Sequence, residues 1–230
     1  MSAEPIEKHF ALALELGPTN EGSALALVER VEPRSWPAPD VALNAKATYE
    51  VRGLRRFPPG MQPPRIIDDV RGLLDTGAIG EELRKKYVDV APNHKWPVRS
   101  HLYWIVDQTT VGSPMADYFL ERLGRPSAQR VIFGGQHAET ESEGVLHIPK
   151  SLQISEVQAL LEEERLKISD QHPLAPDLMG ELANYRHRRS TPVAPADDPW
   201  REQPNDDLIF AVGLACRRLK TPPFLIWDTL

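Results

Sequence analysis

The sequence predicts an α/β fold, with helices flanking a mixed sheet. Its first segments, through residue 56, are strand-like and separated by turn residues. The remaining chain alternates short apolar runs with stretches of helical periodicity. Strands that come first and then alternate with helices are typical of a mixed sheet covered by helices.

Each predicted element is bounded by Gly, Pro or polar turn residues. The first two segments are rich in Ala and Leu, so helix competes with strand there. The interruption GPTNEG between them argues against one continuous helix and predicts a hairpin. The predicted strands are residues 9–17, 23–32, 46–56, 102–107 and 130–133, and the predicted helices are residues 64–75, 113–123, 151–163, 174–188 and 206–219.

Length and composition predict a single domain over residues 1–230, with its core at about 9–219 and a C-terminal tail at 220–230. One cysteine, Cys216, excludes an intramolecular disulfide and a Cys-rich zinc site. No apolar run reaches the ~20 residues of a membrane span, and no secretory signal opens the chain, so we expect a cytoplasmic protein without membrane contact. The net charge of −6 disfavours indiscriminate nucleic-acid binding without excluding a nuclease.

Carboxylates at two strand ends and one helix start are the candidate site. Glu15 lies near the end of an apolar strand, with apolar neighbours on both sides in sequence, where an unpaired carboxylate is costly. Asp107 ends the apolar run LYWIVD, at the strand edge where α/β ligand sites gather, and Ser113 is the better candidate to cap the next helix. Asp206 and Asp207 precede the last helix, where one acid is explained by capping and the second is left over. Together these acids predict an all-oxygen site for two Mg²⁺ or Mn²⁺ ions, of the kind that cleaves phosphodiesters.

Four segments, in order and spacing, resemble the nuclease domain of tailed-phage large terminase subunits over residues 9–219: ALELGPTNEGSAL, IVDQTTVGSP, VLHIPK and WREQPNDDLIFAV. The resemblance implies a ribonuclease H-like fold and two-metal cleavage of double-stranded DNA during genome packaging in a bacterial host cell. It also implies that Glu15, Asp107, Asp206 and Asp207 hold the metal ions and are catalytic.

The chain departs from that family at several positions. Glu15 and Glu21 stand where Asp is usual, Thr110 where Gly is common, and Asn205 where His is frequent. These departures favour a first alternative, a catalytically impaired module of the same fold that binds DNA or a partner. A second alternative is an actin-like phosphotransferase, because LGPTNEGSA resembles the first phosphate loop of that group, although such enzymes need two lobes.

Basic residues and partners complete the sequence predictions. The group Arg186, Arg188 and Arg189 is the preferred phosphate contact, with Lys150 as a further one. Two other basic groups, 52–56 and 217–220, are expected to be solvated surface or to suit a helix end. The sequence has no GxxxxGK[ST] phosphate loop, so ATP binding is not expected. A separate packaging ATPase or a portal protein is the expected partner.

Overall fold

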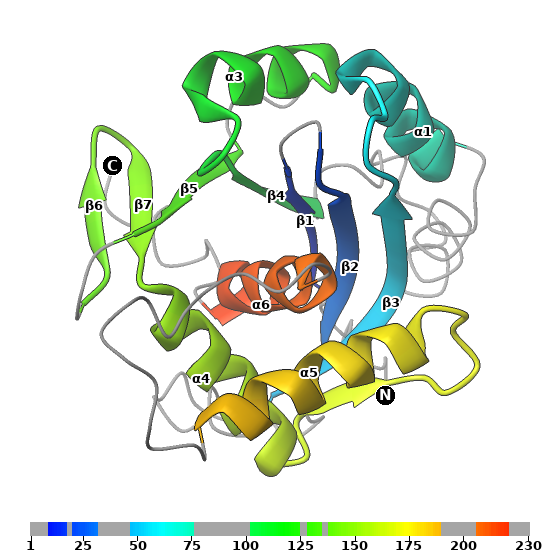
Figure 1. The fold of residues 1–230 in the computed structure, drawn as a ribbon, viewed down its shortest axis with the longest axis vertical. Coiled ribbons are helices and arrows are strands. Elements are labelled where there is room, and N and C mark those ends of the chain that lie inside the picture. Colours follow the sequence, from blue (N-terminus) through cyan, green and yellow to red (C-terminus); the bar gives the residue numbers. More distant parts are fainter. Residues whose placement is uncertain are drawn as a thin grey trace, which may run out of the picture.

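The computed structural model describes residues 9–17, 20–31, 47–75, 102–124, 128–134, 138–189 and 206–220, without the side chains of 185–189. Its strands form one mixed sheet with the order β6-β7-β5-β4-β1-β2-β3-β8 (Figure 1). The strands are β1 (His9–Glu15), β2 (Ser23–Val31), β3 (Thr48–Phe57), β4 (Leu102–Asp107), β5 (Gln129–Phe133), β6 (Thr140–Ser142), β7 (Val145–Ile148) and β8 (Leu166–Ile168). The helices are α1 (Pro63–Asp75), α3 (Gly112–Arg122), α4 (Lys150–Glu162), α5 (Ala175–Arg189) and α6 (Asp207–Lys220).

The sheet combines a meander with parallel additions on both sides. β1, β2 and β3 pair antiparallel, one after another. β4 joins β1 in parallel, and β5 and β7 extend that side, also in parallel. The carboxyl ends of β1, β4 and β5 therefore lie at one edge of the sheet. This architecture confirms the predicted α/β fold with a mixed sheet and is consistent with the ribonuclease H-like fold that the resemblance implies.

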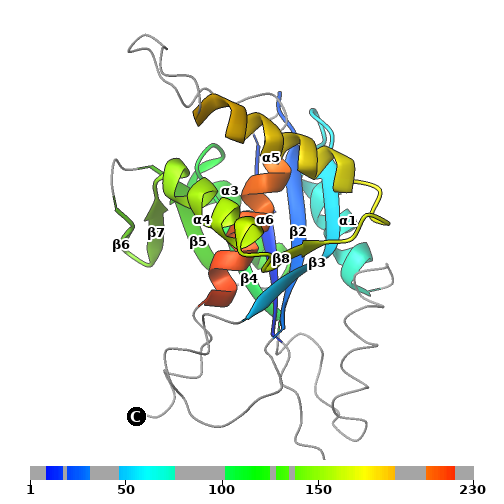
Figure 2. The same ribbon diagram turned by 90° about the horizontal axis from the view of Figure 1, so that it is seen from below.

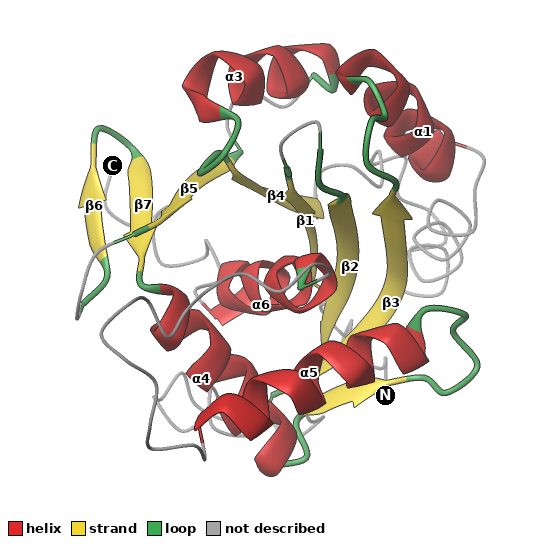
Figure 3. Cartoon of the chain, viewed as in Figure 1, coloured by secondary structure: helices red, strands yellow, loops and turns green. Residues whose placement is uncertain are grey.

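Helices cover both faces of the sheet (Figures 1 and 3). α6 packs mainly on β1 and β2, and α4 and α5 lie against α6 on the same side (Figure 2). α1 and α3 cover the opposite face. Each face has its own apolar core, so the central strands are buried on both sides.

The Ala and Leu content of β1 follows from this two-sided burial. Ala11 and Ala13 belong to the core under α6, whereas Leu12 and Leu14 belong to the core under α1 and α3. β2 alternates in the same way. Small side chains on one face allow α6 to approach the sheet closely, and large ones fill the other face. The period of two predicts a strand and removes the helical alternative for these segments.

Predicted and observed elements differ mainly at their ends. The elements whose ranges the sequence predicts are found with bounds shifted by at most two residues, whereas β6, β7 and β8 are not among those ranges. Ser113 is not the cap of α3: the N-cap is Val111, which makes no side-chain capping bond, and the Ser113 hydroxyl accepts a hydrogen bond from Gln108. None of the described helices has the length and apolarity to cross a membrane. The single-domain prediction for 1–230 remains a prediction.

Candidate functional site

Glu15 and Asp107 lie side by side at the carboxyl edge of the sheet. Leu14 pairs with Val106 across the parallel strands β1 and β4, so Glu15 and Asp107 follow as the next neighbours. Neighbouring strands are about 4.8 Å apart, and laterally paired side chains share a face. Both acids therefore point to the face that α6 covers, since Ala13 and Ile105, each two residues earlier, belong to that core.

The start of α6 brings two more acids to this edge. Asp206 is buried and directly precedes the helix, and Asp207 is its first residue. Gly22, in the turn between β1 and β2, packs against the Asp207 carboxylate, because a Cβ at Gly22 would lie 2.9 Å from Oδ2 of Asp207. Gly17 is needed in the same turn, since its Cβ would overlap the Gly22 carbonyl oxygen at 1.8 Å. The two glycines of GPTNEG thus let the turn close against the helix start.

The four acids, here named the acidic cluster (Glu15, Asp107, Asp206 and Asp207), interact electrostatically. The pKa of Glu15 is raised well above its usual value, first by burial and then by the charges of Asp107, Asp207 and Asp206. Among the described residues, no group hydrogen-bonds to its buried Oε2. The register brings Glu15 and Asp107 together, and these interactions relate both to the acids at the start of α6, whereas their catalytic and metal-binding roles stay predictions.

Local hydrogen bonds hold the Asp107 carboxylate. Its Oδ1 accepts from the Thr109 amide at 2.9 Å and also from the Thr109 hydroxyl. The Phe133 amide, at the end of β5, in turn donates to the Thr109 hydroxyl oxygen at 2.7 Å. Asp107 therefore has a fixed orientation that is set by two strand ends. Its side chain does not cap α3, in agreement with the sequence interpretation.

Lys150 is the cation among the groups that shift the pKa of Glu15. It is the first residue of α4, its ammonium lies 5.3 Å from the centroid of the Phe210 ring, and its charge lowers the pKa of Glu15. A cation beside several carboxylates offsets part of their repulsion. Lys150 follows the carboxyl end of β7, at the same edge of the sheet as Glu15 and Asp107, and the nucleic-acid contact predicted for it stays a prediction.

Glu181 is a functional candidate that the sequence predictions missed. It lies on the buried side of α5, accepts a hydrogen bond from the Ile209 amide at 2.8 Å and pairs with Arg56 of β3. Burial raises the pKa of Glu181 to about 8, with further increases from Asp207 and Asp206, while the amide and Arg56 lower it. Both carboxylate oxygens accept hydrogen bonds, Oε2 from the Ile209 amide and Oε1 from Arg56. An acid on the same helical face as buried Leu residues was the signal in the sequence.

The donor chemistry of the cluster fits a divalent ion. Carboxylate oxygens are the ligands of Mg²⁺ and Mn²⁺, and the partnerless Oε2 of Glu15 is an acceptor that a cation would satisfy. Within the described ranges, however, no three Asp, Glu, His or Cys side chains are arranged so that they could hold a metal ion together. The chemistry is therefore in place, whereas the side chains are not assembled into a coordination shell.

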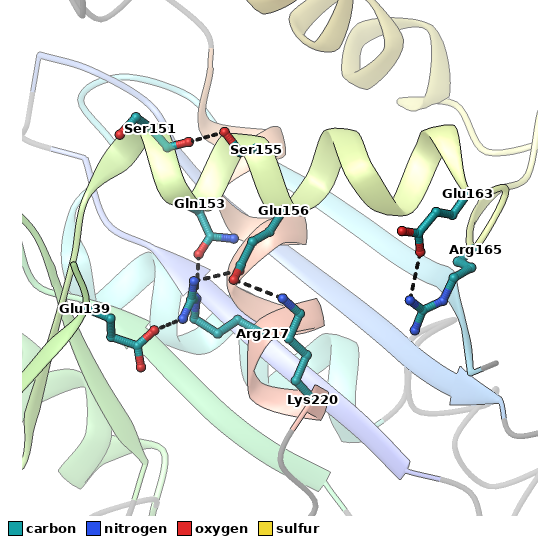
Figure 4. Close-up of polar contacts among 9 residues, drawn as sticks. All are labelled: Glu139, Ser151, Gln153, Ser155, Glu156, Glu163, Arg165, Arg217 and Lys220. Carbon is teal, nitrogen blue, oxygen red and sulfur yellow. Dashed lines mark hydrogen bonds and ion pairs between the residues drawn. The ribbon is translucent and has the colours of Figure 1, made fainter. Parts of the chain in front are cut away.

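Most of the predicted surface cations have partners of their own. Arg217 pairs with Glu139 and with Glu156 and donates to Gln153, and Lys220 also pairs with Glu156 (Figure 4). Arg218 stacks over a tyrosine ring, with its guanidinium carbon 4.6 Å from the centroid of Tyr103. The contacts of Arg217, Arg218 and Lys220 thus connect α6 to neighbouring elements. The side chains of Arg186, Arg188 and Arg189, and residue Asn205, lie outside the described residues.

No protein-family model matches the chain, and no curated protein matches it. Among solved structures, the chain is similar to the large terminase nuclease from thermophilic phage G20c. The similarity covers 94% of this chain and 86% of that chain, with a TM-score of 0.46 and 16% sequence identity. The functional assignment rests on the geometry of the acidic cluster.

Proposed function

We propose that the protein is a metal-dependent endonuclease that hydrolyses phosphodiester bonds of double-stranded DNA at the acidic cluster. One observation carries the proposal: Glu15 presents a buried carboxylate oxygen that has no hydrogen-bond partner among the described residues, where three other acids raise its pKa. Such a group is unfavourable in the protein alone, because burial and like charges both oppose its ionisation. Cation binding would offset that cost, which is why we assign the cluster to metal binding rather than to stability.

The residues have different parts in the proposed reaction. Glu15, Asp107, Asp206 and Asp207 would hold two Mg²⁺ or Mn²⁺ ions. Bound ions of this kind supply an activated water and stabilise the leaving oxygen of a phosphodiester. Thr109 keeps Asp107 oriented, and Lys150 favours the ionised form of Glu15 and would contact a phosphate of the substrate. No covalent nucleophile is needed, and Cys216, whose thiol is buried in α6, takes no part.

The test is cleavage of supercoiled plasmid DNA by the purified chain with Mn²⁺ or Mg²⁺, compared with Asp107→Asn. The variant keeps the shape of the side chain and removes one charge. We expect activity to fall by at least about 100-fold, because even the loss of an outer-shell partner costs about 10–100-fold. Mn²⁺ should support faster cleavage than Mg²⁺, since Mg²⁺ demands near-ideal octahedral geometry and Glu15 is longer than the usual Asp.

Asp117→Asn is the matched control. Asp117 is an exposed acid of α3 that pairs with Arg130, and its loss should leave cleavage unchanged. If the wild-type chain binds DNA but cuts it with neither metal, the catalytic proposal fails and the DNA-binding module replaces it. A packaging ATPase or a portal protein is the proposed partner in a bacterial host cell, and co-purification with either would test that part separately.

A further inference from the structure

The start of α6 is held by contacts that come from two distant parts of the chain. The Ile209 amide, in the first turn of α6, donates to Oε2 of Glu181 on α5. The other oxygen of Glu181 accepts from Arg56 on β3. First-turn amides of a helix have no partner within the helix, so Glu181 acts as its cap from another element.

Arg56 belongs to the same transverse row of the sheet as the acidic cluster. The register places Glu15 opposite Ala24 on β2, and Ala24 opposite Arg56 on β3. Asp107 continues the row on β4, beyond Glu15. Since paired residues share a face, Arg56 points to the α6 side with Glu15, two strands and about 10 Å away. Ala24 lies between Glu15 and Arg56, and its small side chain allows the start of α6 to pack there.

This arrangement opposes a repulsion that the acidic cluster creates. The Asp207 carboxylate packs against Gly22 in the turn that follows β1, so the start of α6 carries its negative charge towards the carboxyl end of β1. Without an opposing contact, the like charges would push the first turn of α6 away from the sheet. The hydrogen bond from the Ile209 amide to Glu181 and the ion pair between Glu181 and Arg56 hold that turn against α5 and β3 instead.

We propose that Glu181 is a positioning residue that, together with Arg56, holds the first turn of α6 over the sheet so that Asp206 and Asp207 face Glu15. Glu181 acts through α6 and is not itself assigned as a metal ligand. The inference rests on the proposed function, because it makes metal affinity depend on a residue outside the acidic cluster. Outer-shell groups that orient ligands have this effect in metal sites generally.

Glu181→Ala is the test variant, and Glu29→Ala is its matched control. Glu29 is also a buried acid paired with an arginine of β3, Arg52 at 2.7 Å, but it lies five residues along β2 from Ala24 and away from the cluster. Both variants remove a buried carboxylate and should lower the melting temperature. Glu181→Gln, which keeps the size and one acceptor, should behave in between and replaces the alanine variant should that one fail to fold.

Two measurements separate positioning from general stability. Amide hydrogen exchange at Ile209 without metal should accelerate about 10-fold or more in Glu181→Ala relative to Ala215 in the same helix, because Ile209 has no intrahelical acceptor. The Mn²⁺ concentration for half-maximal plasmid cleavage should rise about 10–100-fold. Glu29→Ala should change neither quantity.

Each outcome decides the matter. If amide exchange at Ile209 is unchanged in Glu181→Ala, Glu181 does not hold the first turn of α6, and the proposal is overturned whatever the response to metal. Faster exchange combined with an unchanged Mn²⁺ requirement would reduce Glu181 to a helix cap and overturn its role at the site. Failure of the wild-type chain to respond to Mn²⁺ would overturn the proposed function and the metal-linked role of Glu181 together. Amide exchange at Ile209 would still decide whether Glu181 holds the first turn of α6.

Discussion

Glu15→Gln should stabilise the metal-free protein while removing its response to Mn²⁺. The glutamine keeps the length of the side chain, carries no charge and offers an amide that can donate to neighbouring carboxylates. The Oε2 that it replaces is buried and has no hydrogen-bond partner among the described residues. Stabilisation by removal of a functional side chain is the signature of a site that is maintained for activity at the expense of stability.

The size of the effect follows from the burial of that oxygen. A buried acceptor left unsatisfied costs about 1–3 kcal/mol, so Glu15→Gln should raise the free energy of unfolding by about that amount at pH 8. For a chain of this length each kcal/mol shifts the melting temperature by about 2–4 °C. The pKa of Glu15 is raised in the folded state. The contribution of Glu15 to the free energy of unfolding is therefore most favourable below its unfolded-state pKa of about 4.3, where the carboxyl is protonated in both states. That contribution is lost as the pH rises towards the folded-state pKa. The advantage of the variant should accordingly vanish near pH 4.

Thermal unfolding at pH 4 and pH 8, with EDTA or with Mn²⁺, measures both parts of the prediction. Mn²⁺ at about 100 times its Kd should stabilise the wild type by about 2.7 kcal/mol and reverse the order of the two proteins. Glu21→Gln, at an exposed position of the adjacent turn, is the control and should shift stability by less than about 0.5 kcal/mol. A lower melting temperature for Glu15→Gln at pH 8 without metal would refute the reasoning.

Four further predictions concern packing, the support of the cluster and the reactivity of Cys216. Gly213→Ala should destabilise the protein by about 1–3 kcal/mol in chemical denaturation, because its Cβ would lie 2.2 Å from a side-chain nitrogen of α4. Gly180→Ala, with open space around it, should instead stabilise by up to about 1 kcal/mol. Thr109→Val removes the hydroxyl that orients Asp107 and should raise the Mn²⁺ requirement for cleavage about 10-fold, read by metal titration. Cys216 should resist iodoacetamide in the native state, by mass spectrometry, because burial raises the pKa of its thiol to about 12.

The sequence predicts the central strands well, because their signal is local. Alternating Ala and Leu in β1 and β2 reflects burial on both faces, with small side chains under α6 and large ones on the opposite face. The glycines of the turn between these strands allow its close approach to the start of α6. The same period of two places Glu15 on the face of Ala11 and Ala13. That part of the site follows from residues that are adjacent in the chain.

Edge strands and partners of charged residues do not follow in this way. β8 consists of three residues, Leu166–Ile168, and pairs with β3 more than a hundred residues earlier, so no local pattern reveals it. Arg217 and Lys220 suit a helix C-terminus by composition, but their ion pairs with Glu139 and Glu156 depend on how α4 and β6 approach α6. A cluster of basic residues in the sequence therefore indicates charge and does not indicate that the charge is available to a phosphate.

The position of the helix start is the clearest case of a property that sequence patterns miss. Capping rules explain one of Asp206 and Asp207 at the helix start and leave the other over, but they do not say where the second carboxylate points. In the fold, the Ile209 amide is satisfied by Glu181 from α5, so the helix does not need both of its own acids for capping. Asp206 and Asp207 interact electrostatically with Glu15. In the proposed positioning role, the contact that Glu181 supplies from a distant segment holds these two acids towards Glu15, and no local pattern around residues 206 and 207 reveals that contact.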